Sequence, residues 1–97
     1  MAEVGRQAGT VRKHVWYSGH VQGVGFRYTA QRLAQRYRVG GFVRNLRDGR
    51  VELVAEGQPG EVEAFLQDVA RAMSGYITHQ EQREEMPEGL THFRIAY

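Results

Sequence analysis

Cysteine is absent from this 97-residue sequence, and so is any long apolar run. Without thiols the chain cannot form disulfides, thiolate metal sites or a cysteine nucleophile. No segment is apolar enough to cross a membrane, and Met1–Thr10 lacks the apolar stretch of a signal peptide. We therefore expect a cytoplasmic protein without membrane association, with residues 1–10 as a flexible tail and residues 11–97 as one domain.

Acidic residues are scarce in the first half of the chain. Residues 1–50 contain ten Arg and Lys but only Glu3 and Asp48 as acids, whereas residues 51–97 contain three Arg and nine acids. This distribution makes the first half suited to an anionic ligand. A solvated surface without function would show the same asymmetry, so charge alone leaves both interpretations open.

The first half of the chain predicts a strand, a loop and a helix. β-Branched and aromatic residues favour a strand over 11–18, and three glycines in residues 19–25 predict a loop. From Phe26 to Tyr37 the apolar residues recur with helical spacing, and we expect Gly40–Gly41 to end this helix.

A hairpin is the next predicted feature. The runs 42–47 and 50–56 flank Asp48–Gly49, a pair typical of tight hairpin turns. Two sets of side chains alternate along the second run, and we expect the first set to lie on the drier face: these sets are Val51, Leu53, Ala55 and Glu52, Val54, Glu56.

The remaining residues predict a second helix and two further strands. An apolar stripe starts after Pro59 and stops at Ser74–Gly75, which is typical of a helix. Residues 76–85 and 92–97 are expected to be strands. The resulting order is β-α-β-β-α-β plus a short C-terminal strand. It predicts an α+β sandwich with one mostly antiparallel sheet and both helices on one face.

The loop before the first helix is the clearest candidate site. A strand-to-helix junction leaves backbone N–H groups unpaired, and glycines allow them to converge on an anion. The loop from Gly19 to Arg27 is therefore a candidate phosphate-binding site. The guanidinium of Arg27 can bind two phosphate oxygens at once. A tight turn with a solvated Arg27 is the alternative interpretation.

Asn45 is the second candidate, because the predicted βαβ connection can bring it near Arg27. Its amide is neutral at every pH, so it can orient a water molecule but cannot act as a base. An asparagine that merely hydrogen-bonds near the turn is the structural alternative.

These few groups restrict the chemistry. The candidate residues include no metal cluster, nucleophile–base pair or paired carboxylates. Hydrolysis of a phosphate monoester needs an acceleration on the order of 10²¹, which one Arg and one Asn cannot supply. An acyl phosphate has a carboxylate leaving group that needs no general acid, so positioning and charge stabilisation suffice.

The two motifs resemble those of the acylphosphatase family. Residues 19–27, Gly-His-Val-Gln-Gly-Val-Gly-Phe-Arg, resemble its phosphate loop. Residues 41–45, followed by Asp48–Gly49, resemble its second motif at the family spacing. The resemblance covers about residues 11–97. One departure is Tyr17, where an aliphatic residue is usual.

This resemblance implies a ferredoxin-like fold and hydrolysis of an acyl phosphate without a metal or other cofactor. It implies that Arg27 binds phosphate and that Asn45 orients water. It also implies the full set of phosphate-binding residues, which we call the cradle: Gln22, Gly23, Val24, Gly25, Phe26 and Arg27. We expect a monomer that binds a small acyl phosphate, or inorganic phosphate or another anion in the loop, and no nucleic acid.

Two other functions remain open from the sequence. One is a phosphate-binding acylphosphatase-like domain without catalysis. The other is an RNA-binding module of the same element order, although the predicted third strand lacks the stacking aromatics that such modules use.

Overall fold

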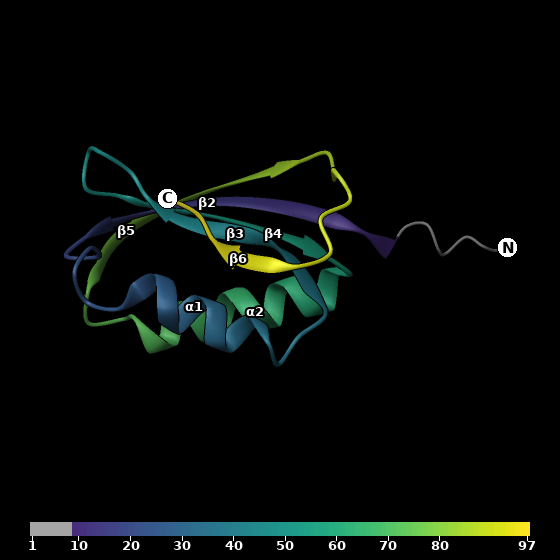
Figure 1. Ribbon diagram of the computed structural model, residues 1–97, viewed down its shortest axis with the longest axis horizontal. Coiled ribbons are helices and arrows are strands. Elements are labelled where there is room, and N and C mark those ends of the chain that lie inside the picture. The colour runs from purple at the N-terminus through teal and green to yellow at the C-terminus, as the bar shows by residue number, and fades with distance from the viewer. Residues whose placement is uncertain (1–8) are drawn as a thin grey trace, which may run out of the picture.

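The computed structural model describes residues 9–97 (Figure 1). The predicted tail, residues 1–10, lies mostly outside the described residues. The elements in chain order are β2 (Val11–Gly19), α1 (Phe26–Ala34), β3 (Val39–Asn45), β4 (Val51–Gly57), α2 (Pro59–Ala72), β5 (Ile77–Glu85) and β6 (Phe93–Ile95). Both predicted helices and all five predicted strands are therefore present.

One sheet of five strands forms the first layer, and two helices form the second. The strand order is β5-β2-β4-β3-β6. Neighbours are antiparallel except β3 and β6, which are parallel. Figure 1 shows α1 and α2 side by side on one face of the sheet, and no helix of residues 9–97 lies on the opposite face. The predicted α+β sandwich is confirmed.

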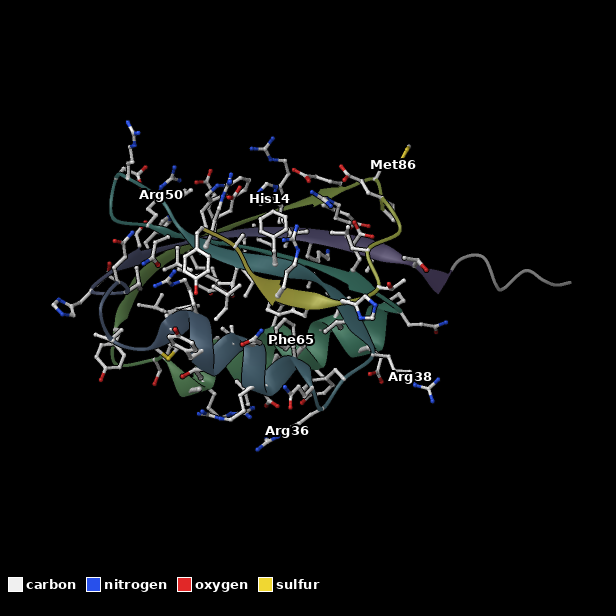
Figure 2. All side chains as sticks on the ribbon, viewed as in Figure 1. His14, Arg36, Arg38, Arg50, Phe65 and Met86 are labelled. Carbon is white, nitrogen blue, oxygen red and sulfur yellow. The ribbon has the colours of Figure 1, made fainter. Side chains whose placement is uncertain are left out.

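The core lies between the sheet and the helices. Alternate residues of β2 and β4 point toward α1 and α2, which place Phe26, Leu33 and Phe65 against them. Figure 2 shows Phe65 between the two layers, whereas Arg36 lies on the outer side of the helices and Arg38 projects beyond their end. The apolar periodicity therefore identified the buried face of both helices.

The predicted end of the first helix is wrong. The α-helix stops at Ala34, and Gly40 and Gly41 belong to β3. A Cβ on Gly41 would lie 1.8 Å from the Val54 carbonyl oxygen, and a Cβ on Gly40 would lie 2.1 Å from that of Leu90. These glycines are needed because two backbones approach them closely, not because a helix ends there.

The predicted drier face of β4, with Val51, Leu53 and Ala55, is confirmed, but the second face is buried as well. Glu52 and Glu56 are 7% and 1% exposed, although they alternate with the core residues as expected. Arg12 Nη1 donates to Glu56 at 2.7 Å, and His14 Nε2 lies 2.7 Å from a Glu52 oxygen. Side chains of β2 therefore cover these carboxylates, and Figure 2 shows His14 on the side of the sheet away from the helices.

The Asp48–Gly49 hairpin is confirmed. The Leu46 N–H donates to the Arg50 carbonyl at 2.8 Å, and Gly49 has a positive φ of 95°. The Asp48 carboxylate accepts from the Arg50 N–H at 3.1 Å, which fixes the turn. The turn carries β3 directly into β4 and so sets the position of Asn45.

Candidate active site

The candidate residues gather where β2 and β3 end. Both strands are antiparallel to β4, so they run in the same direction and finish at the same edge of the sheet. Val51 of β4 is opposite Tyr17 on one side and Asn45 on the other. The cradle follows β2 at this edge, and Asn45 is the last residue of β3.

Glycine conformation shapes the cradle. Gly23 and Gly25 have φ values of 78° and 81°, in the left-handed region that residues with a Cβ rarely adopt. No atom lies within 4 Å of a Cβ built on either residue, so space is not the constraint. The backbone turn itself requires glycine at these positions.

The start of α1 leaves its backbone donors free. Gly25 is the N-cap residue and provides no side-chain cap. Among residues 9–97, no acceptor receives a hydrogen bond from the N–H groups of residues 22–28. Unpaired N–H groups at a helix N-terminus, together with the helix dipole, form a site for an anion.

Arg27 adds a full positive charge to this helix start. It is half-buried, and it forms no ion pair within the described part of the chain. Its guanidinium carbon lies 5.2 Å from the centre of the Tyr97 ring. Tyr97 reaches this position because β6 runs parallel to β3 and ends at the same edge. The contact orients Arg27 while leaving its N–H groups available for a ligand.

The Gln22 side chain ties the cradle to the hairpin. Its Nε2 donates to the carbonyls of Leu46, at 2.7 Å, and Arg50, at 3.0 Å. Leu46 follows Asn45 directly, so this pair of bonds fixes the cradle next to the end of β3. The side-chain amide nitrogen of Gln22 is thereby used, whereas its backbone N–H has no acceptor within residues 9–97.

Asn45 lies on the helix side of the sheet. Side chains alternate along a strand, so Asn45 shares its face with Val43, which is fully buried in the core between sheet and helices. Asn45 itself is half-buried, and within residues 9–97 its amide has no hydrogen-bond partner. A half-buried amide with free donors and an acceptor can hold a water molecule.

The structure thus brings the cradle and Asn45 to one edge of the sheet. Sequence reasoning did not find the Gln22 bridge or the contact between Tyr97 and Arg27. No local pattern points to either, because each joins segments that only the sheet order brings together. The four histidines are not part of this edge as a group; His14 lies between Glu52 and Glu85 on the opposite face.

Two further features concern ligands and membranes. Residues 9–97 contain no group of three or more His, Asp or Glu side chains placed to hold a metal ion. Over the same residues, no helix is both long enough and apolar enough to span a membrane.

Comparison with known proteins agrees with this geometry. The acylphosphatase family model matches residues 13–95. The acylphosphatase of Synechococcus sp. (strain JA-2-3B'a(2-13)) is 52% identical over 86 residues, covering 88% of this chain and 92% of the relative. The solved acylphosphatase from Bacillus subtilis has a TM-score of 0.81 and 33% identity, covering 90% of this chain and 99% of that one. The acylphosphatase from Coxiella burnetii has a TM-score of 0.82 and 26% identity, covering 97% and 100%.

The chain therefore belongs to the acylphosphatase family. It is an enzyme that hydrolyses acyl phosphates to a carboxylate and inorganic phosphate. The ferredoxin-like fold and the reaction class expected from the sequence are both confirmed. The roles of individual residues stay predictions.

Proposed function

We propose that this acylphosphatase binds the phosphoryl group of its substrate in the cradle, with Arg27 gripping two phosphate oxygens and Asn45 orienting the attacking water. The reaction proceeds without a metal ion. The substrate is a small acyl phosphate, and inorganic phosphate leaves from the same site.

One observation carries the proposal: free N–H groups, an unpaired arginine and an unpaired amide meet at one edge of the sheet. The N–H groups of residues 22–28 have no acceptor within residues 9–97. Gln22 holds the cradle against the residue after Asn45. This arrangement offers many hydrogen-bond donors and, among the described residues, no acidic partner for Arg27, which suits a dianionic phosphoryl group.

The chemistry follows from the leaving group. The water oxygen forms a bond to phosphorus while the bond from phosphorus to the acyl oxygen breaks. The carboxylate departs as a stable anion, so no general acid is needed. Because Asn45 cannot accept a proton as a base, the proton of the water passes to a phosphate oxygen of the substrate. Arg27 and the N–H groups stabilise the charge on the equatorial oxygens during transfer.

The test is hydrolysis of benzoyl phosphate in excess EDTA. We expect turnover by the native enzyme and a loss of about 10²-fold or more in kcat for Asn45→Ala, with inorganic phosphate still bound. Arg27→Ala should lose about 10³-fold or more in kcat/KM and should also lose phosphate binding. Arg27→Lys should recover little, because an ammonium group cannot make the two parallel hydrogen bonds.

Arg47→Ala is the matched control, because Arg47 is an exposed hairpin arginine outside the cradle. It should retain native kinetics. Activity lost in EDTA and restored by a metal ion would contradict the metal-free reaction. Native activity in Asn45→Ala would contradict its assigned role, and phosphate binding without turnover by the native protein would indicate a non-catalytic phosphate-binding domain.

A further inference from the structure

Strand β5 is an edge strand of the sheet. It is the outermost strand, and among residues 9–97 no strand pairs with its outer edge. Its register with β2 is continuous from His79 to Glu85, with the only shift at Ser18/Gly19. A regular, unpaired edge of this length can accept another extended strand.

Both sides of β5 are accessible to such a strand. His79, Glu81 and Arg83 are exposed on the face without helices. On the other face, Gln80 and Gln82 border a groove between β5 and α2, so no helix covers them. A strand arriving in the plane of the sheet meets no obstacle among the described residues.

We propose that β5 is a self-association surface, on which a second copy of this chain pairs its own β5 antiparallel about Gln82. The expected neighbours are Gln82 with the partner's Gln82, Glu81 with the partner's Arg83, and His79 with the partner's Glu85. Because of the two-fold axis, the Glu81–Arg83 pair and the His79–Glu85 pair each occur twice in one interface.

Charge selects this register over its alternatives. Two antiparallel copies of one strand can pair about a residue, and the shared two-fold axis passes through that residue. Centring on Glu81 places Glu81 against itself and His79 against Arg83, and centring on Arg83 places Arg83 against itself and Glu81 against Glu85. Centring on Gln82 opposes Glu81 to the partner's Arg83 twice, places Gln80 opposite the partner's Glu84, brings no like charges opposite each other, and pairs seven residues, 79–85. Opposite charges directly across a ladder stabilise it, and like charges destabilise it.

The two central charges of this register, Glu81 and Arg83, lack other ionic partners within residues 9–97. The Arg83 guanidinium lies over the Trp16 ring, 5.1 Å from its centre. Glu85 is held by Arg12 at 2.9 Å and by His14 at 2.8 Å, so its position is fixed. The same charges that disfavour pairing with an arbitrary strand therefore favour a matching copy.

This interface is small, so the dimer should be weak and dependent on concentration. It departs from the monomer expected from the sequence. It is independent of catalysis, because neither Glu81 nor Arg83 belongs to the cradle or contacts Asn45.

The first experiment is sedimentation of the full chain at low salt up to millimolar concentration. We expect the mass to rise toward twice that of the monomer, and Glu81→Arg or Arg83→Glu alone to remain monomeric. An equal mixture of these two variants should dimerise, because each Arg then faces a Glu across the axis. The double variant E81R/R83E should dimerise for the same reason. All these proteins should hydrolyse benzoyl phosphate at the native rate, which confirms that they are folded.

The second experiment uses the absence of cysteine in the native chain. Gln82→Cys places two thiols across the axis, within the range for a disulfide, whereas Gln80→Cys separates them by about 13 Å along the strands. Under mild oxidation Gln82→Cys should form a covalent dimer much faster than Gln80→Cys. A native chain that stays monomeric at every concentration, or equal cross-linking of both cysteine variants, would overturn the proposal.

Discussion

Replacing Gln22 with Ala tests whether the bridge between the cradle and the hairpin positions the active site. The variant removes the hydrogen bonds from Nε2 to the carbonyls of Leu46 and Arg50. It leaves the cradle glycines, Arg27 and Asn45 in the sequence unchanged. Any loss of activity then reports on the relative placement of the two halves of the site.

Gln22→Ala should lower both the free energy of unfolding and kcat. Each lost hydrogen bond is worth about 0.5–1.5 kcal/mol. The Leu46 carbonyl keeps the Gly49 N–H at 3.2 Å, and the Arg50 carbonyl keeps the Leu46 N–H at 2.8 Å, so neither is orphaned. We therefore expect the free energy of unfolding to fall by only about 1–2 kcal/mol. A displacement on the order of 1 Å between the cradle and Asn45 can lower the rate of the chemical step by up to about 10²-fold. We therefore expect kcat to fall about ten- to hundredfold.

The assay is benzoyl phosphate hydrolysis combined with urea unfolding of the same protein. Gln67→Ala is the control, because Gln67 is an exposed glutamine on α2. Gln22→Glu should be at least as impaired as Gln22→Ala, since a carboxylate cannot donate to the two carbonyls.

Unchanged kinetics in Gln22→Ala would refute a positioning role for Gln22. If Gln22→Ala loses the expected stability but keeps native kcat and KM, the bridge is structural only. The proximity of Asn45 to the cradle would then need another cause, and the proposed water-orienting geometry would lose its main support.

Three further predictions concern other buried or terminal groups. Glu56→Gln should lower the free energy of unfolding by about 1.5–3 kcal/mol at pH 7, because the buried Arg12 loses its charged hydrogen bond to Glu56 and keeps the one to Glu85. Burial acts to raise the pKa of Glu56, but hydrogen bonds from Arg12 and from three backbone N–H groups lower it below its usual range overall. Its stabilising contribution is therefore complete above the ordinary carboxylate pKa and is lost as pH falls through the lower folded value, so urea unfolding should show the native and variant curves converging in acid. Tyr17→Phe should raise the free energy of unfolding by about 1 kcal/mol, because the fully buried Tyr17 hydroxyl has no partner within residues 9–97 and burial raises its pKa. Tyr97→Ala should raise KM about two- to fivefold and leave kcat nearly unchanged. This factor corresponds to the free energy of one exposed cation–π contact, about 0.5–1 kcal/mol, here between Tyr97 and Arg27.

Each of these predictions has a contradicting result. A Glu56→Gln protein as stable as the native one at pH 7 would mean that Arg12 finds another partner. A clear loss of stability in Tyr17→Phe would reveal a partner for the hydroxyl, such as a bound water molecule. An unchanged KM in Tyr97→Ala would show that the ring does not hold Arg27 in place.

Local patterns were enough to identify the elements, the hairpin and the cradle. The helical spacing after Phe26, the Asp48–Gly49 turn and the glycines before Arg27 all concern residues that are close in sequence. Their conformations depend on neighbouring side chains and on positive φ angles. The apolar spacing and the glycines that mark these features can be read from the sequence. The acyl phosphate substrate class also followed from residue types alone, because the available groups could not support more demanding chemistry.

Only the tertiary structure determined the contacts between segments that are distant in the sequence. Gly40 and Gly41 resemble a helix end, but the approach of the Leu90 and Val54 backbones explains them. Glu56 resembles a solvated strand residue, yet Arg12, 44 positions away, draws it into a buried ion pair. Such contacts have no period and no spacing that a sequence reveals. They depend on the strand order, which places β2 beside β4 and brings the cradle, Asn45 and the end of the chain to one edge of the sheet.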